Sequence, residues 1–354
     1  MATLKDVAKL AGVAPITVSR VINDPQSVKE RTRLKVEQAI KQINYMPNSI
    51  ARSLVTNRTN TIGVLLSNIA NPYFSDFILG VETKARELGK NVFICNGMNY
   101  ESAMSNINLL MEKRVDGMIL TSFEFDSIGL QEKLLRELER LNANEKHSVQ
   151  FVLVDPSPKQ TLLTSIQIDN YMAATVAMDH LHELGHKAIA HLSLNRDADV
   201  WIDRFKAYKD AQGRINIPLN TEHIALIDKE DVRLAEEATY RLLLTTPRPT
   251  AIFAANDTLA VGALQAAHRT RLRIPEDISI IGIDGNDIAK HSYPRMTTVV
   301  HPRYRLGELS AELLIDLING KEDTASLLIK CTLQVNESTG PLLMQTEGIN
   351  EQHD

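Results

Sequence analysis

Cysteine is scarce in this 354-residue chain, and long apolar runs are missing. Its two cysteines, Cys95 and Cys331, lie in apolar surroundings without metal-ligand spacing, so we expect buried, reduced thiols in a reducing compartment. No run approaches the roughly 20 apolar residues of a membrane span. Charges recur every few residues in the first ten positions, unlike a secretory signal peptide. Together these absences favour a cytoplasmic protein without a membrane segment.

Catalytic motifs are absent as well. The sequence has no Gly-x-Ser-x-Gly turn, no phosphate-binding loop, no metal-ligand triad and no nucleophile placed with a base. We therefore expect neither an enzyme nor a bound cofactor or metal, and interpret acidic residues in a cleft as hydroxyl acceptors. A sugar-binding receptor for transport is the alternative, but a basic head would have no purpose in such a protein.

Charge is unevenly distributed along the chain, whose overall net charge is −5. Residues 1–60 contain ten lysines and arginines against four acidic residues, which leaves −11 for the remainder. A basic module joined to an acidic body is expected when only the first part meets phosphates. The 44% hydrophobic and 23% charged residues are typical of a globular protein, and the length predicts two or three domains.

The stretch from Leu4 to Asn23 predicts two short helices joined by a turn. Ala8 is small enough for the helices to cross closely, and Gly12 falls at the turn, where a positive φ carries no steric penalty for glycine. One apolar stripe is expected to join the helices, made of Val7, Leu10, Val18 and Val21. The outer face of the second helix would carry Pro15, Ile16, Thr17, Ser19, Arg20 and Asn23. This pattern indicates a helix-turn-helix whose second helix enters the DNA major groove.

A third helix and a linker are expected next. The helix is predicted over Lys29–Ile43, with an apolar face made of Leu34, Val36, Ala39, Ile40 and Ile43. Residues 47–60 form a linker. Its segment Ser49–Val55 is too short to hold a helix alone, so we expect it to fold only on binding.

From Thr61 onward, short apolar strands alternate with amphipathic helices in two successive runs. This alternation predicts an α/β body of two lobes, each a parallel sheet covered by helices on both faces. Ligands bind at the carboxyl ends of such strands, so the two lobes would share one cleft. The helix Arg303–Leu317 and the strands after it are expected to complete the first lobe.

The expected boundaries are 1–46 for the headpiece, 47–60 for the linker, 61–339 for the body and 340–354 for a disordered tail. Within the body, we expect lobe one over 61–165 and 298–330, and lobe two over 166–297 and part of 331–339.

Several motifs of this sequence occur together in one known family. The head carries TLKDVAKLAGV, TVSRVIN, NYMPN and ARSL, and the body carries IANPYFSD, VDGMILT, HLHELGHKAIAHL, DRFKAY, AIFAANDTLAVGAL, DISIIGIDG, TTVVHP and VNEST. From about Leu4 to Thr339 the chain therefore resembles the LacI/GalR family of transcription regulators. The resemblance implies a helix-turn-helix headpiece, a hinge helix and a two-lobed body like a periplasmic binding protein. It further implies a homodimeric repressor of a near-palindromic operator, whose DNA affinity changes when a small molecule enters the cleft.

Two positions depart from the family pattern. The family usually has a hydroxyl where Ala14 stands, so a helix N-cap worth about 1 kcal/mol is lost. Pro15 nevertheless suits a first helical turn. Asn336 stands where the family often has arginine, and nothing in the sequence explains that change.

By resemblance, the second helix of the head reads DNA. Pro15 and Ile16 occupy the main base-reading positions but cannot form bidentate hydrogen bonds, so we expect apolar contact, for instance with thymine methyl groups. Arg20 is the candidate for a bidentate contact with guanine, and a phosphate contact is the alternative. Ser27 could reach the DNA backbone or a base edge. Groups suited to phosphate oxygens are carried by Thr3, Thr17, Ser19, Asn23 and Tyr45.

The resemblance also implies that Ser49–Val55 forms a hinge helix in the minor groove beside its dimer mate. Leu54 would wedge between the central base pairs, with Ala51 close to the groove floor, and Asn48 is assigned to the same DNA contact. Such a wedge costs roughly a few kcal/mol of unstacking and bends the DNA. A stray apolar residue in a linker is the alternative for Leu54.

The strand ends and loops of the body supply candidates for effector binding. Arg204 matches the family arginine that bonds effector hydroxyls or a carboxylate. Asp284 can accept two sugar hydroxyls, and Asn256 offers both a donor and an acceptor. Tyr73 and Phe74 lie in a loop that resembles the family's ligand-facing loop, where one of them could belong to the core instead.

Four further effector candidates carry a weaker signal. Trp201 could stack on a sugar or lie in the core, and His301 could be a ligand group or a structural histidine. Thr121 and Asp155 end strands of the first lobe. The polar and aromatic groups favour a sugar over a purine, whereas Arg204 leaves a sugar acid or sugar phosphate open.

Overall fold

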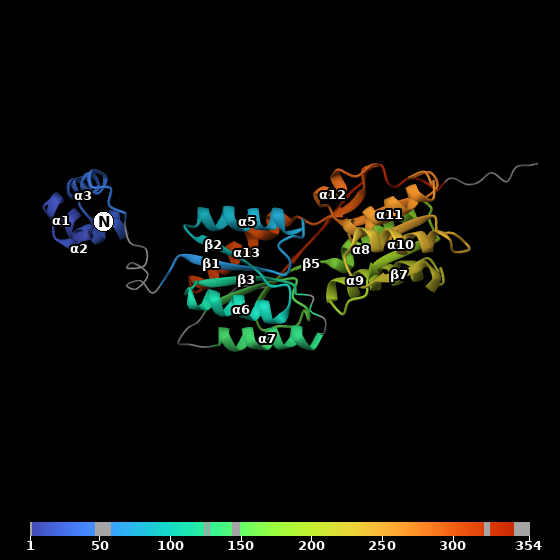
Figure 1. The fold of residues 1–354 in the computed structure, drawn as a ribbon, viewed down its shortest axis with the longest axis horizontal. Helices are drawn as coiled ribbons and strands as arrows, with labels where there is room; N and C mark the ends of the chain where they lie inside the picture. The colour runs from blue at the N-terminus through green and yellow to red at the C-terminus, as the bar shows by residue number, and fades with distance from the viewer. Residues whose placement is uncertain are drawn as a thin grey trace, which may run out of the picture. The chain divides into compact units, whose positions relative to one another are not determined.

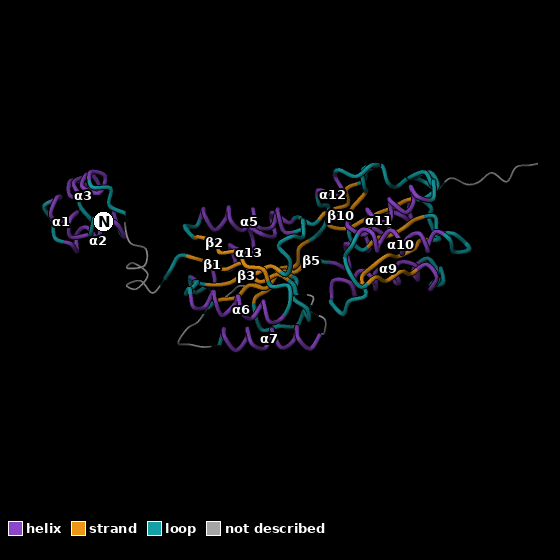
Figure 2. Tube along the Cα trace, in the orientation of Figure 1, coloured by secondary structure: helices purple, strands orange, loops and turns teal. Residues whose placement is uncertain are grey.

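The computed structural model describes residues 2–46, 58–123, 125, 128–143, 149–321 and 326–342. It divides the chain into two compact units, residues 1–59 and 60–354, which are the headpiece and the body. Among the described helices, none is long and apolar enough to cross a membrane. Figures 1 and 2 show the helical headpiece and the two α/β lobes of the body.

The headpiece is a bundle of three helices: α1 (Leu4–Ala11), α2 (Pro15–Asn23) and α3 (Glu30–Gln42), with a 3₁₀ turn at Pro25–Ser27. Gly12 ends α1 in the left-handed conformation, with φ of +66°, as the sequence predicts. The core consists of Val7, Ala8, Val18, Val21, Val36 and Ala39.

Two leucines expected in this headpiece core lie at the surface instead. Leu10 is 45% exposed and Leu34 is 48% exposed, so the predictions for both were wrong. Each leucine lies two residues from a buried residue of its helix, Ala8 or Val36. Because each helical residue turns by about 100°, two positions place the leucine on the opposite side.

The first lobe contains a parallel sheet with strand order β11-β5-β4-β3-β1-β2. Its strands are β1 (Thr61–Leu66), β2 (Asn91–Asn96), β3 (Gly117–Thr121), β4 (Gln150–Val154), β5 (Thr164–Ile168) and β11 (Leu327–Ile329). Helices cover both faces (Figure 1): α5 (Phe74–Glu87) and α13 (Arg303–Ile318) on one side, α6 (Tyr100–Glu112) and α7 (Ile128–Asn142) on the other. α13 and β11 return to this lobe as expected, but the last strand, β12 (Thr332–Gln334), joins the second sheet, so the expectation that the strands after α13 complete the first lobe was wrong for β12.

Helices α5 and α13 pack closely because glycines lie at their contact. A Cβ atom on Gly80 would lie 2.1 Å from the carbonyl oxygen of Tyr304, and one on Gly307 would lie 2.1 Å from that of Phe77. Both glycines are therefore required by the close approach of the two backbones. This contact holds the carboxy-terminal helix α13 against the first crossover helix.

The second lobe has the strand order β12-β10-β9-β8-β6-β7, with only β12 antiparallel. Its strands are β6 (Ile189–Leu194), β7 (Ile224–Ile227), β8 (Ala251–Ala254), β9 (Ser279–Asp284), β10 (Thr297–Val300) and β12 (Thr332–Gln334). The helices are α8 (Asn170–Glu183), α9 (Asp199–Arg214), α10 (Val232–Leu243), α11 (Asp257–Arg269) and the short α12 (Asp287–Lys290). Helices α8 and α9 pack on one face, and α10 and α11 on the other.

The lobe boundaries differ from those expected. β5 pairs with β4 as far as Ile166 and with β11 as far as Ile168, so lobe one continues past residue 165. β10 pairs with β9, so lobe two continues to Val300 rather than ending at 297. Apolar periodicity identifies a strand but not its neighbour, which is why sequence alone misplaced both crossings.

The first residues of the expected tail are ordered against lobe two. The Gly340 amide donates to Ser279 Oγ at 3.1 Å, and the Leu342 amide donates to the Leu184 carbonyl at 2.8 Å. The prediction of disorder was therefore wrong for 340–342. Residues 343–354 lie outside the described residues.

Candidate DNA-reading helix and ligand cleft

The outer face of α2 presents the residues expected to read DNA bases. Ala14 caps α2 without a side-chain hydrogen bond, and Pro15 is the first helical residue. Pro15, Ile16 and Arg20 are exposed, Ile16 to 63%, whereas Val18 on the inner face is fully buried. An exposed isoleucine beside an arginine is available for contact with a base edge in the major groove.

The other DNA candidates of the headpiece lie around this helix. Thr17 and Ser19 are half-buried on α2, and Tyr45 packs partly buried against the headpiece core. Asn23 is the last residue of α2, but its side chain is not among those described. Three linker candidates lie outside the described residues: Asn48, Ala51 and Leu54.

Two hydroxyl groups assigned to DNA already form hydrogen bonds within the headpiece. Thr3 caps α1: its Oγ1 donates to Asp6 Oδ2 at 2.7 Å and accepts from the Asp6 amide at 3.3 Å. The bond from the Thr3 hydroxyl and a second one from the Thr3 amide to Asp6 Oδ2 at 2.8 Å hold the pKa of the Asp6 carboxyl below its usual value. Ser27 Oγ donates to the Asp24 carbonyl at 2.8 Å. A phosphate contact by either hydroxyl proton would replace one of these bonds.

In the body, one cavity brings all nine predicted effector residues together at the carboxyl ends of both sheets. Its volume is about 650 Å³, including the part open to solvent. From the first lobe come Tyr73, Phe74, Thr121 and Asp155. Trp201, Arg204, Asn256, Asp284 and His301 complete the predicted set.

Six lining residues were missed: Ser67, Asn71, Ser122, Val154, Val200 and Glu230. Ser67 directly follows β1 and Ser122 directly follows β3, so the strand-end rule would have found both. Glu230 lies just beyond β7 and accepts a 3.5 Å hydrogen bond from Asn71 of the other lobe. No sequence signal indicated that pairing.

Arg204, on α9, is buried and largely engaged by the protein itself. Its Nε and Nη2 donate to Asn170 Oδ1 at 3.0 and 2.7 Å, and Nη1 donates to the Ala255 carbonyl at 2.5 Å. Asp284 Oδ1 lies 3.6 Å from Nη2, and the Trp201 ring lies 5.4 Å from the guanidinium carbon. Three of its five N–H donors are thus used within the protein, which leaves at most two for a ligand.

The two cleft aspartates stand at strand ends in unusual backbone conformations. Asp155 has a φ of +47° and Asp284 a φ of +122°. Asp155 Oδ1 accepts from the Ile168 amide at 2.6 Å, and burial raises the pKa of this carboxyl to about 6. Burial also raises the pKa of Asp284 well above its usual value, partly opposed by Arg204. Both carboxyl groups are therefore poorly solvated, and burial favours the protonated form of each, which can donate a hydrogen bond to a ligand as well as accept one.

Aromatic groups line the same cavity. The Tyr73 ring is edge-on to Phe74 at 5.3 Å and to His301 at 5.9 Å. Phe74 and Trp201 also belong to the two lobe cores, so each combines packing with a position at the cavity. Trp201 Nε1 and both ring nitrogens of His301 find no hydrogen-bond partner among the described residues. Burial and the nearby arginines lower the pKa of His301 well below its usual value, so this ring is neutral.

Two of the predicted polar candidates have local structural partners. Asn256 Oδ1 accepts from the Leu259 amide at 2.9 Å and caps α11, so its Nδ2 donors and one lone pair of Oδ1 are left for a ligand. Thr121 Oγ1 accepts from the Ser67 amide at 3.0 Å, which fixes the loop after β1. The expectation that Asn256 offers a ligand both a donor and an acceptor stays a prediction.

These features define a class of protein: a helix-turn-helix headpiece joined to a two-lobed α/β body like that of periplasmic binding proteins. Residues 3–48 match the family described as bacterial regulatory proteins, lacI family, and residues 178–339 match a periplasmic binding protein-like domain. The chain belongs to the lacI family of transcription regulators, which are not enzymes, and it is a transcriptional repressor of that family. The headpiece match sets the transport-receptor alternative aside.

Relatives and solved structures agree over almost the whole chain. The HTH-type transcriptional repressor PurR of Vibrio atlanticus is 36% identical over 323 residues, which are 91% of this chain and 93% of that protein. A Lac repressor dimer bound to operator and the anti-inducer ONPF has a TM-score of 0.82 at 28% identity, covering 96% of this chain and 99% of the other. A transcriptional regulator CelR–cellobiose complex has a TM-score of 0.68 at 29% identity, covering 96% and 100%.

Proposed function

We propose that this chain represses transcription as a homodimer on a near-palindromic operator and that a neutral sugar in the cleft controls its DNA affinity. The observation that carries the choice of ligand is the charge of the cleft. Three carboxyl groups line it, from Asp155, Glu230 and Asp284, against the single cation of Arg204. A neutral polyol supplies hydroxyl donors to these acceptors without adding negative charge.

Anionic ligands fit this cleft poorly. Three of the five Arg204 N–H donors bond to Asn170 and Ala255, its charge lies 3.6 Å from Asp284, and His301 is neutral, so the described lining residues offer a carboxylate or phosphate at most two arginine donors. An anion would add to the negative charge of the lining carboxylates at close range, against one arginine. Of the three classes left open by the sequence, sugars are therefore favoured over sugar acids and sugar phosphates. The cellobiose complex of a structural relative supports the same class.

Polar links between the lobes supply the switch. Lys159 pairs with Asp203, the Asp199 amide donates to Ser157 Oγ at 3.1 Å, and Arg303 Nη1 donates to the Asp284 carbonyl at 2.5 Å. All three links cross from one lobe to the other. A ligand that binds both lobes would stabilise one lobe arrangement over another, in proportion to its differential affinity.

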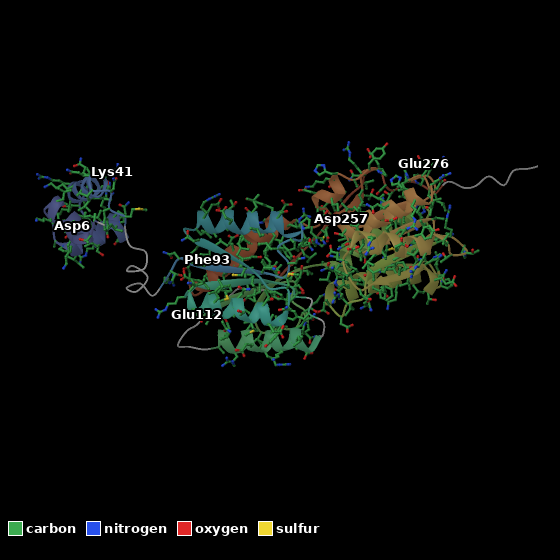
Figure 3. All side chains as sticks on the ribbon, in the orientation of Figure 1. Asp6, Lys41, Phe93, Glu112, Asp257 and Glu276 are labelled. Atoms are coloured by element: carbon green, nitrogen blue, oxygen red, sulfur yellow. The ribbon has the colours of Figure 1, made fainter. Side chains whose placement is uncertain are left out.

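The edge of the first sheet is the proposed dimer surface. β2 is an edge strand that exposes Phe93 to 49% and Ile94 to 41% (Phe93 is labelled in Figure 3), and the helices that contact it expose Leu79 and Leu109. A long apolar edge strand is an aggregation hazard unless another chain covers it. The operator-bound dimer of the Lac repressor supports a second copy as that partner.

A ligand screen tests the proposal. Trp201 is the only tryptophan and lies at the cavity, so its fluorescence reports binding by the full-length protein. Neutral sugars should change this emission. DNA sites that the protein selects from a random duplex pool should be two-fold symmetric. The same sugars should change how much of this DNA the protein retains. Binding restricted to sugar acids, sugar phosphates or purines would overturn the choice of ligand. Selected DNA without two-fold symmetry would contradict the dimeric operator.

A further inference from the structure

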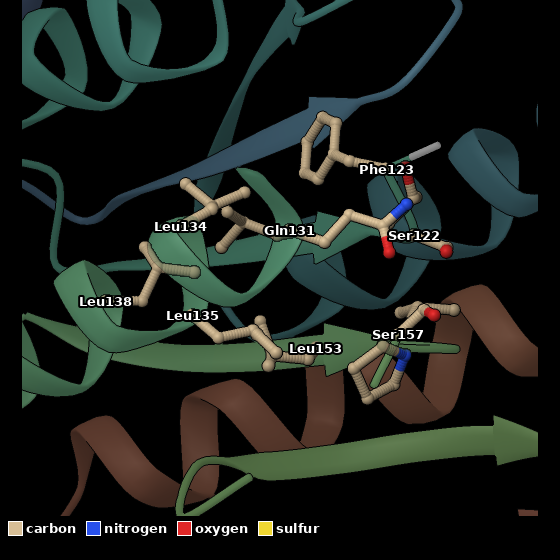
Figure 4. A pocket seen from close by; sticks show the side chains of 12 residues that line it. Ser122, Phe123, Gln131, Leu134, Leu135, Leu138, Leu153 and Ser157 are labelled. Atoms are coloured by element: carbon tan, nitrogen blue, oxygen red, sulfur yellow. The ribbon is translucent and has the colours of Figure 1, made fainter. Parts of the chain in front are cut away.

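A second, smaller cavity opens beside the cleft, between the ends of β3 and β4 and helix α7 (Figure 4). Its volume is about 300 Å³, including the part open to solvent. Three residues, Thr121, Ser122 and Val154, line both cavities. The smaller cavity, called the side cavity below, is therefore an extension of the cleft and not a separate site.

The walls of the side cavity are apolar. They are formed mainly by Phe123, Leu134, Leu135, Leu138 and Leu153. Such walls exclude a charged or fully hydrated group but accept a methyl or methylene group. A ligand would enter from the cleft past Ser122.

Two polar atoms in the side cavity have no hydrogen-bond partner within the described part of the chain. Gln131 is 4% exposed, and its Oε1 has no partner among the described residues. Ser122 Oγ is likewise buried and without a partner there. Both side chains line the cavity, and Figure 4 shows the Gln131 amide turned toward Ser122. Because buried polar atoms are nearly always hydrogen-bonded, a missing polar group belongs between them.

We propose that the side cavity binds the hydroxymethyl branch of a hexopyranose unit, an inference that rests on the proposed sugar-controlled function. Gln131 Oε1 can only accept a hydrogen bond, whereas Ser122 Oγ can donate one. A single ligand hydroxyl satisfies both atoms, donating to Gln131 and accepting from Ser122. The methylene that carries it packs against Leu134 and Leu153. Gln131 is thus a specificity residue that selects hexoses over pentoses and over 6-deoxy sugars.

Matched sugar series test this assignment. Xylose, 6-deoxyglucose and glucose share the same ring stereochemistry. They differ only in the branch on the ring, which is absent in xylose, a methyl group in 6-deoxyglucose and a hydroxymethyl group in glucose. The arabinose–fucose–galactose, lyxose–rhamnose–mannose and ribose–6-deoxyallose–allose series cover other ring configurations. Trp201 fluorescence of the full-length protein gives each dissociation constant. In the series that binds, the hexose should bind about tenfold tighter than its 6-deoxy analogue, because the analogue leaves both polar atoms unpaired.

Variants connect this preference to the side cavity. Gln131→Leu should weaken hexose binding about tenfold and change the affinity for the 6-deoxy sugar by no more than about twofold. The preference for the hexose should therefore disappear. Ser122→Ala should reduce the same preference and serves if Gln131→Leu does not fold. Gln150→Leu, the same change at the opposite end of β4, is the control and should preserve it.

The possible failures are distinguishable. A pentose or 6-deoxy sugar that binds wild-type protein as tightly as the hexose would overturn the side-cavity assignment while leaving sugar control intact. If Gln131→Leu lowers the affinity for all three sugars of a series equally, the assignment is also overturned, because that result indicates general damage to the binding site. If no sugar of any series binds the wild-type protein, the proposed sugar-controlled function fails, and the inference fails with it.

Discussion

Asp155 and Arg204 show how burial sets the chemistry of single residues in the cleft. The Arg204 guanidinium donates hydrogen bonds to Asn170 and Ala255, and these bonds orient it without a ligand. Asp155 has one backbone donor, from Ile168, and its burial disfavours the ionised form. The arginine is therefore a fixed part of the site, whereas the aspartate can still bond a ligand hydroxyl.

The raised pKa of Asp155 predicts a stability change between about pH 4 and pH 6. Its folded-state pKa is about 6 against an ordinary value of 3.8, so the folded protein binds a proton that the unfolded chain has already lost. Its stabilising contribution is therefore complete below pH 4 and is lost as pH rises to 6, by about 2–3 kcal/mol. Chemical denaturation of wild-type protein and Asp155→Asn across this range measures the effect. The variant should lose less stability over that interval, and parallel curves would contradict the assignment.

Arg20 carries the prediction for DNA reading. Arg20→Ala should remove about 1–3 kcal/mol of discrimination at one base pair of each half-site, because a bidentate contact with guanine is lost. Competition with single-base variants of a selected operator measures this preference. Arg31→Ala is the control, an exposed arginine on α3, and it should weaken binding without changing the preference. Uniform weakening by Arg20→Ala on all DNA would assign Arg20 to a phosphate instead.

At the scale of helices and strands, backbone geometry decides where glycine is needed. Gly12 must adopt a positive φ to end α1, although a Cβ atom there would meet nothing within 4 Å. Gly213 also has open space around it but lies inside α9 with ordinary helical geometry. A side chain therefore has room at both positions, and only at Gly12 does the backbone conformation disfavour it.

These glycines predict effects of opposite sign. Gly12→Ala should destabilise the headpiece by about 1 kcal/mol, because alanine resists the left-handed conformation. Gly213→Ala should stabilise the body by about 0.5–1 kcal/mol, because alanine loses less conformational entropy on entering a helix. Thermal unfolding of the full chain, followed by hydrogen exchange in each unit, separates the two effects. A stabilised headpiece in Gly12→Ala would refute the capping argument.

For the whole molecule, sequence reasoning predicts classes of elements better than their partners. The headpiece and both parallel sheets follow from local patterns, whereas the prediction of the nine cleft residues needed the family resemblance as well as the strand-end rule, because Tyr73, Phe74 and Arg204 came from that resemblance. The sheet membership of β10 and the position of 340–342 depend on pairing between distant segments, which periodicity does not encode. The engagement of Arg204 and the open acceptor of Gln131 depend on side-chain placement, which only the folded chain fixes.

Dimerisation gives a prediction for the assembled molecule. Phe93→Glu places a charge on the exposed edge of β2, where burial against a second copy would leave that charge unpaired. The variant should dissociate to monomers at concentrations where wild-type protein is dimeric, as measured by analytical ultracentrifugation. Affinity for a two-fold symmetric operator should fall by at least about tenfold, because each headpiece must then bind alone.

The opposite edge of the same sheet supplies the control for this experiment. Leu328 on β11 is 62% exposed, so Leu328→Glu makes the same chemical change at an edge outside the proposed dimer surface. It should leave both the sedimentation coefficient and the operator affinity unchanged. Dissociation caused by Leu328→Glu, with a stable dimer in Phe93→Glu, would move the interface to β11. That outcome would leave the headpiece and cleft assignments in place, because neither depends on which edge of the sheet pairs.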